Sequence, residues 1–217
     1  MARTSEQPSG PPRFVVIAVI LAGLLILGAG ALLGLAFRDN PKGAAGTLLA
    51  SAIGGKFDLV DQNGKPFGDG DLKGKWHLVF FGYTNCPDAC PTTLNELSLA
   101  LDKLGKEREA VGIVLISVDP ERDTPAVLKS YVESFDAPIV ALTGSAEQVA
   151  RAAKAYRVYY AKHPRADAGS NRGAKGGYDM DHSAVIYVMD KEGRFTATFT
   201  PESTAEAIAT RLQKLLL

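Results

Sequence analysis

The chain has 217 residues, of which 24 are basic and 24 acidic, so its formal net charge is zero. Lysine and arginine are scattered along the sequence and form no basic stripe, which excludes nucleic acid binding as its function. The length accommodates one domain of about 150 to 180 residues and one additional segment.

The additional segment is apolar and lies near the N-terminus. Residues 14–37 (FVVIAVILAGLLILGAGALLGLAF) contain no charged or amide side chain. A helix of this length would span the roughly 30 Å hydrocarbon core of a membrane with some tilt. The apolar run of a cleavable signal peptide is shorter, about 7–15 residues, so we predict a single uncleaved transmembrane helix. Residues 1–13 then form a short polar tail, and residues 38–55 form a linker.

The orientation of this anchor does not follow from the flanking charges. Two basic residues, Arg3 and Arg13, precede the span, and two others, Arg38 and Lys42, follow it, so the positive-inside count is tied. The usual arrangement for such an anchor leaves the short tail in the cytoplasm. We therefore expect a single-pass protein of the cytoplasmic (inner) membrane, with its folded domain on the periplasmic or extracytoplasmic side.

The folded domain is predicted over residues 56–217. Asn63-Gly64 between short apolar runs predicts a hairpin at its start. Apolar runs and helical stripes then alternate. Strands are predicted over residues 76–83, 112–119, 138–143, 183–189 and 194–199. Helices are predicted over residues 92–106, 125–135, 145–158 and 203–216.

This order of elements predicts an α/β fold with a mixed sheet, in the arrangement called thioredoxin-like. Residues 159–181 do not fit it, because they have no hydrophobic period and contain many glycines and mixed charges. A loop of that length in a compact domain is usually functional or mobile. The loop leads directly into His182.

The only two cysteines, Cys86 and Cys90, directly follow the first predicted strand, and each precedes a proline. Residues before proline favour extended backbone, so we predict that the helix begins at Pro91 with Cys90 at its cap. A helix start favours negative charge and lowers the pKa of a thiol there. A structural disulfide would close a very small loop and stabilise little. A redox pair and a two-thiolate metal site remain open, although redox pairs usually have the spacing Cys-x-x-Cys and a metal would need a further ligand.

Three histidines could supply that ligand. His77 lies within a predicted buried strand, which favours a core position, and His163 lies in the long loop, which favours an exposed one. His182 opens the strand predicted over residues 183–189, whose start should face the helix that carries the cysteines. Position alone leaves a metal ligand and an ordinary core histidine equally open for His182.

Three separated motifs resemble the Sco/SenC family: residues 82–91 (GYTNCPDACP), 117–125 (SVDPERDTP) and 181–183 (DHS). Their order and spacing match across residues 55–216. The resemblance implies a thioredoxin-like domain held outside the cytoplasmic membrane. It also implies one copper ion, Cu(I) or Cu(II), bound through Cys86, Cys90 and His182. Family members assist assembly of the dinuclear copper centre of cytochrome c oxidase on subunit II, by delivering copper, by reducing cysteines, or both.

Two acidic residues are candidates for a supporting role beside these ligands. Asp181 is in a position to orient His182, although a capping or solvated aspartate is an equal alternative. Asp88, between the cysteines, is expected to be exposed and to tune the thiolates or meet a partner. The motif 117–125 is expected to shape the loop after the second strand rather than to take part in chemistry.

We expect a metallochaperone rather than an enzyme. The alternatives are a thiol–disulfide oxidoreductase that uses Cys86 and Cys90 as its redox pair, and a redox sensor. A peroxidase of the peroxiredoxin type is disfavoured, because its motif Pro-x-x-x-Thr-x-x-Cys would require threonine and proline where Tyr83 and Val79 stand.

Overall fold

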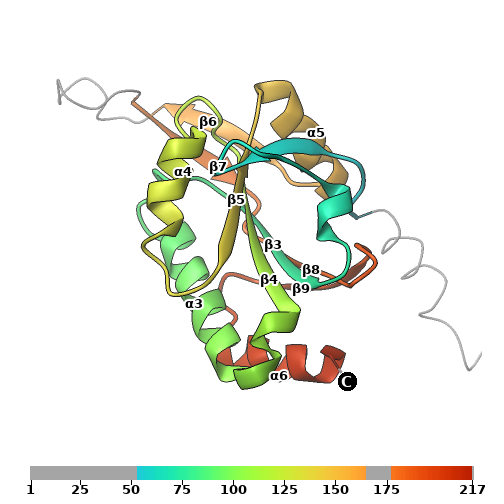
Figure 1. Cartoon of the computed structure of the whole chain (residues 1–217). Coiled ribbons are helices and arrows are strands. Elements are labelled where there is room, and N and C mark those ends of the chain that lie inside the picture. Colours follow the sequence, from blue (N-terminus) through green and yellow to red (C-terminus); the bar gives the residue numbers. More distant parts are fainter. Residues whose placement is uncertain (1–52, 165–176, 217) are drawn as a thin grey trace, which may run out of the picture. The chain divides into compact units, whose positions relative to one another are not determined.

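The computed structural model describes residues 53–164 and 177–216, which form a mixed α/β fold around a seven-stranded sheet (Figure 1). The predicted tail, the predicted anchor and the linker up to residue 52 lie outside the described residues. Within the described part, no helix has the length and apolar character needed to cross a membrane. Across the sheet the strands are β2 (Pro66–Gly68), β1 (Asp58–Asp61), β5 (Ile139–Thr143), β4 (Val111–Ser117), β3 (Trp76–Gly82), β8 (Ile186–Met189) and β9 (Phe195–Phe199).

The centre of the sheet is parallel. Strands β3 and β4 pair from Trp76 opposite Val111 to Gly82 opposite Ser117, and β5 pairs in parallel with β4 on its other side. Both central strands are almost entirely buried, as expected of continuous apolar runs in a parallel sheet covered on both faces. The remaining neighbours are antiparallel, which confirms the predicted mixed sheet.

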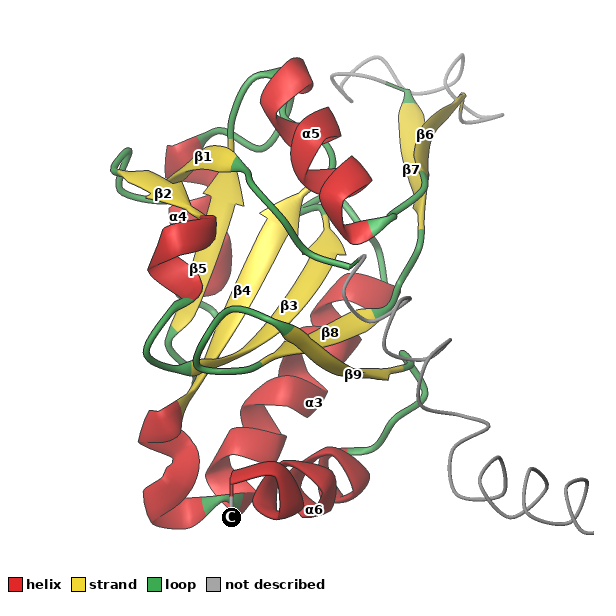
Figure 2. Cartoon of the chain, turned by 90° about the vertical axis from the view of Figure 1, so that its right-hand side faces the viewer, coloured by secondary structure: helices red, strands yellow, loops and turns green. Residues whose placement is uncertain are grey.

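Helices cover both faces of the sheet. Figure 2 shows α5 (Ala146–Tyr156) in front of the strands, and α3 (Ala89–Lys103) and α4 (Pro125–Val132) behind them. The closing helix α6 (Ala205–Leu216) packs against α3. Short 3-10 helices, η1 (Asp69–Leu72) and η2 (Gly105–Ala110), lead into β3 and β4.

The predicted turn is confirmed, and two helices start at side-chain caps. In the β1–β2 hairpin, the Asp61 carboxylate accepts hydrogen bonds from the backbone N–H groups of Asn63 and Lys65, and Gly64 has the positive φ of +76° that glycine tolerates. Thr124 caps α4 through its hydroxyl, with proline at the first helical position. Ser145 caps α5.

The start of α3 differs from the prediction. The helix begins at Ala89, so Cys90 lies inside its first turn rather than at the cap. Proline at the third helical position is tolerated, because the amide hydrogen that it lacks would have no acceptor within the helix. The bias that Pro91 imposes on Cys90 is too weak to move the helix start.

The predicted loop over residues 159–181 is partly wrong. Tyr160–Pro164 form β6 and Tyr178–His182 form β7, and the two pair as a separate antiparallel sheet. We call it the β6–β7 sheet; Figure 2 shows it beyond the end of α5, away from the larger sheet. His182 therefore ends β7 instead of opening the next strand, and β8 begins only at Ile186.

Candidate metal centre

The three residues predicted to bind metal lie together. The Sγ atom of Cys90 is 3.6 Å from Nε2 of His182, although the two residues are 92 positions apart. The backbone N–H of Cys90 donates to Sγ of Cys86 at 3.3 Å. Cys86 comes from the loop after β3, Cys90 from the first turn of α3 and His182 from the end of β7. Both cysteines carry free thiols.

The strand β3 makes room for the Cys90 sulfur by ending in glycine. A Cβ atom on Gly82 would lie 3.0 Å from Sγ of Cys90 and 2.9 Å from the Phe80 ring, closer than carbon atoms tolerate. Cys90 itself is fully buried. Sequence reasoning did not single out Gly82, although a glycine at the end of a bulky strand often marks such a close approach.

Aromatic rings and one carbonyl orient the His182 ring. The centroids of Phe80 and Tyr83 lie 6.1 Å and 5.8 Å from that of His182, both in edge-on geometry. The Nδ1 atom of His182 lies 3.4 Å from the carbonyl oxygen of Ser183. An Nδ1–H that donates to this carbonyl leaves the lone pair on Nε2, the nitrogen that faces Cys90.

The structure does not bring Asp181 to His182. Successive side chains on a strand point to opposite faces, and the Asp181 carboxylate lies 3.0 Å from Nε2 of His163 on the neighbouring strand β6. Both side chains are more than half exposed, at 58% and 62%. The exposed position expected for His163 is thus confirmed, and Asp181 has a different partner from the one proposed for it.

The remaining histidine, His77, lies at the start of β3, at the opposite end of that strand from Gly82. It is buried, with Nδ1 3.1 Å from the carbonyl oxygen of Lys75. Burial lowers the pKa of its ring and keeps it neutral. The predicted core position is confirmed.

The two thiols have opposite pKa shifts. The pKa of Cys86 is lowered far below its usual value, first by a hydrogen bond from the Cys90 thiol and then by backbone N–H groups at the start of α3. The Cys86 thiolate and burial raise the pKa of Cys90. The stabilising effect of the helix start therefore acts on Cys86, not on Cys90 as predicted from the sequence.

Asp88 is exposed, as expected. Its carboxylate accepts a hydrogen bond from the Thr92 hydroxyl, and its backbone N–H helps to stabilise the Cys86 thiolate.

The lowered pKa predicts how Cys86 reacts with iodoacetamide. Because the thiolate is the nucleophile and its folded pKa lies below the range tested, the rate at Cys86 should change by less than about twofold between pH 8 and pH 5. An ordinary thiol slows about tenfold per pH unit below its pKa. Mass spectrometry of the labelled peptide measures this rate, and the urea-unfolded chain is the control. A tenfold fall per pH unit in the folded chain would contradict the assignment.

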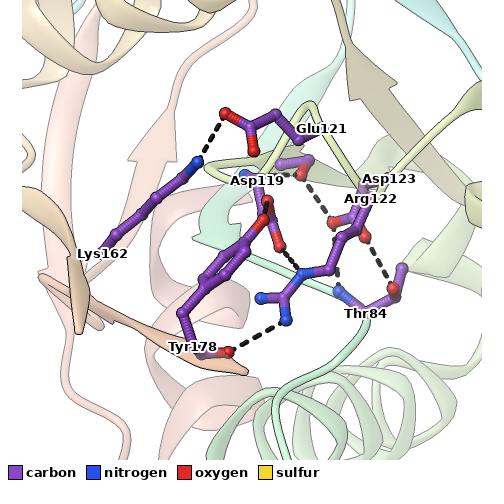
Figure 3. Close-up of polar contacts among 8 residues, drawn as sticks. Thr84, Asp119, Glu121, Arg122, Asp123, Lys162 and Tyr178 are labelled. Atoms are coloured by element: carbon purple, nitrogen blue, oxygen red, sulfur yellow. Dashed lines mark hydrogen bonds and ion pairs between the residues drawn. The ribbon is translucent and has the colours of Figure 1, made fainter. Parts of the chain in front are cut away.

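A buried carboxylate holds the loop that carries Cys86. The side chain of Asp123 accepts hydrogen bonds from the Thr84 hydroxyl at 2.6 Å, from the Thr84 backbone N–H at 3.1 Å and from the Ser117 hydroxyl at 2.6 Å (Figure 3). Asp123 is fully buried, and burial raises its pKa. The loop before the cysteines is thereby joined to the end of β4.

The donor set suits a soft metal ion, since thiolates select Cu(I) and imidazole also binds copper. With bond lengths of about 2.3 Å to sulfur and about 2.0 Å to nitrogen, as zinc has, two ligands of one tetrahedral ion are about 3.6 Å apart. The Cys90–His182 pair has this spacing. Within residues 53–164 and 177–216, no three histidine, cysteine, aspartate or glutamate side chains are already arranged to hold an ion. The Cys90–His182 pair therefore has the spacing of two ligands of one ion, whereas the three proposed ligands together do not form a complete site in this structure.

The chain is similar in sequence and in structure to known proteins. The sequence profile of the SCO1/SenC family matches residues 45–217. A SCO2-like protein of Rickettsia felis is 37% identical over 198 residues, which are 89% of this chain and 94% of that protein. The structure of Bradyrhizobium japonicum ScoI with copper bound is 48% identical, with a TM-score of 0.67 over 75% of this chain and 99% of that one. BsSco, described with a disulfide switch as a member of the Sco family of cytochrome c oxidase assembly proteins, is 26% identical, with a TM-score of 0.57 over 76% of this chain and 93% of its own.

Proposed function

The chain belongs to the SCO1/SenC family, and from this premise we propose that it is a membrane-anchored copper chaperone. It binds one copper ion through Cys86, Cys90 and His182, and it assists assembly of the dinuclear copper centre of cytochrome c oxidase. The observation that carries the proposal is the 3.6 Å separation between Cys90 Sγ and His182 Nε2. The copper in the Bradyrhizobium relative and the assembly role stated for the family of BsSco support it.

The environment of each ligand suits copper as a cargo. Cys86 is ready to bind as a thiolate because its pKa is lowered. Cys90 has to release its proton on binding, as thiol ligands of metals do. Three protein ligands leave a position open to a ligand from the receiving protein, which we propose to be subunit II of the oxidase. Residues 14–37 would hold the domain at the extracytoplasmic face of the membrane, where this exchange takes place.

Copper binding by the full-length chain tests the proposal. The reduced chain in mild detergent, titrated with Cu(I) in competition with a chromogenic chelator, should take up one ion per chain. The same preparation should then transfer the ion to the reduced copper-binding domain of subunit II. The proposal would be wrong if the chain takes up no copper at chelator concentrations that remove only loosely held ions.

A thiol–disulfide reductase is the second candidate function. The observations that favour it are a half-buried Cys86 thiolate beside a protonated Cys90, and the disulfide switch of BsSco. The Cys86 thiolate would attack a partner's disulfide and release one partner thiolate. Cys90, after giving its proton to the released partner thiolate, would then attack the Cys86 sulfur of the mixed disulfide and release the second partner thiolate. The partner thereby gains two electrons, and this chain forms a Cys86–Cys90 disulfide. Reduction of a subunit II disulfide that needs both cysteines but is indifferent to His182→Ala would favour this function.

A further inference from the structure

We infer that Arg122 is a positioning residue that fixes the β6–β7 sheet, and with it His182, beside the two cysteines. The inference rests on the proposed copper function, because only that function makes His182 a ligand. The loop after β4 thereby has a structural role, to hold the β6–β7 sheet, that neither the sequence motif nor the comparisons specify.

The β6–β7 sheet needs such an attachment because it is small and separate. Its strands pair only with each other, and an isolated two-stranded sheet is marginally stable at best in water. Two hydrogen bonds between Tyr159 and Ser183, of 2.9 Å and 3.2 Å, continue the pairing of the two strands just past His182 but join them only to each other. A cavity of about 110 Å³ lies between the sheet and the loop after β4; its lining includes Val118, Pro120, Tyr160, Ala161 and Met180. Apolar packing holds part of this junction, since Met180 is buried in the core, and polar contacts hold the part that the cavity leaves open.

Arg122 makes the central contacts across that junction (Figure 3). Its Nε–H donates to the Asp119 carboxylate, and its Nη1–H donates to the backbone carbonyl of Tyr178 at 3.0 Å. The Tyr178 hydroxyl in turn donates to Asp119 at 2.8 Å. The Asp119 carboxylate, the Arg122 guanidinium and Tyr178 thus all contact one another. This network fixes the first residue of β7, four residues before His182.

The guanidinium also reaches toward the metal centre. It lies 3.8 Å from the ring centroid of Tyr178 and 5.8 Å from that of Tyr83. Tyr83 packs edge-on against the His182 ring and lies three residues before Cys86. A single side chain therefore contacts both the strand that carries the histidine and the segment that carries the first cysteine.

The buried Arg122–Asp119 pair should contribute more to the attachment of the β6–β7 sheet than the exposed ion pair beside it. Asp119 is buried and the Arg122 side chain is only 18% exposed, whereas the Lys162–Glu121 pair, 2.5 Å apart, is half exposed. Exposed ion pairs contribute little. Removing one partner of a buried pair leaves an uncompensated charge. Lysine cannot replace the fork of guanidinium donors, so Arg122→Lys removes the attachment while it keeps the charge.

The test uses the full-length chain in detergent with two readouts. Without copper, amide hydrogen exchange over Tyr178–His182 should become at least about tenfold faster in Arg122→Lys, while exchange in β3 stays unchanged. In the copper-loaded chain, release of Cu(I) to a chelator should accelerate by a similar factor. Tyr178→Phe, which keeps the ring and loses only the hydroxyl, should give a smaller change in the same direction.

The control is Arg151→Lys, which affects the exposed Arg151–Asp58 pair between α5 and β1 and should change neither readout. Unchanged exchange in β7 for both Arg122→Lys and Tyr178→Phe would overturn the inference, even if the unmodified chain binds copper. Faster exchange with unchanged copper release would also overturn it, because His182 would then not depend on Arg122. If the unmodified chain binds no copper, the proposed function fails, and the exchange measurement alone still decides whether Arg122 holds β7.

Discussion

Replacing His182 with alanine is expected to lower the affinity of the chain for Cu(I) by at least about 100-fold. Loss of a group that only supports a metal ligand typically costs 10- to 100-fold in affinity, so loss of a ligand should reach at least the upper end of that range. The two sulfurs would still bind the ion, but without the nitrogen that lies 3.6 Å from Cys90 Sγ. Competition with a Cu(I) chelator of known affinity measures the change.

The matched control is His163→Ala. His163 lies on β6 and contacts the exposed Asp181 carboxylate rather than the thiols, so its loss should leave the affinity within about twofold of the unmodified chain. Full affinity in His182→Ala would show that the metal assignment is wrong, and the dithiol would remain as the functional group. Asp181→Asn separates the sequence-based prediction from the observed geometry, because only a carboxylate that orients His182 would lower the affinity when it is neutralised.

Replacing Asp123 with alanine is expected to destabilise the domain by about 3–5 kcal/mol, because three buried donors lose their acceptor and each unsatisfied buried polar group costs about 1–3 kcal/mol. The substitution leaves the hydroxyl groups of Ser117 and Thr84 and the Thr84 backbone N–H without their acceptor. Urea unfolding measures the change, with fluorescence of Trp76, the only tryptophan in the chain, as the probe.

Asp123→Asn is the matched variant for this measurement. Its side-chain oxygen can keep the bonds from Ser117 and from the Thr84 backbone, and the Thr84 hydroxyl can turn to accept from the new amide. We expect a loss of about 1 kcal/mol. Equal stability of the alanine variant and the unmodified chain would show that these hydrogen bonds carry no net stability, and that Thr84 is held in place by other contacts.

The parts of the fold that follow from local sequence were predictable. β3 and β4 are continuous apolar runs with buried positions on both faces, and Thr124 and Ser145 are short polar residues at helix starts. In each case the signal lies within a few residues of its effect. The proposed set of three metal ligands came instead from the resemblance to a family, because position alone left His182 undecided.

The β6–β7 sheet was not predictable in the same way. The register places His182 opposite Tyr160. The β6 segment shows no hydrophobic alternation, and the alternation in β7 is only five residues long. The same limit applies to Asp181, whose partner His163 comes from the other strand of that pair. The order of the thiol pKa values depends on the conformation of residues 83–88, which decides that Cys86 rather than Cys90 receives the N–H groups at the helix start.

The two sulfurs lie at different depths, since Cys90 is fully enclosed and Cys86 is only half-buried. If the chain carries an ion as proposed, a thiolate of the receiving protein would approach it from the side of Cys86 and His182, which are partly exposed, and not from the side of Cys90. In a stepwise ligand exchange, the bond to the enclosed Cys90 would then be the last to break. Such an order would keep the ion bound throughout the transfer, because the acceptor would hold it before the last bond to the donor breaks.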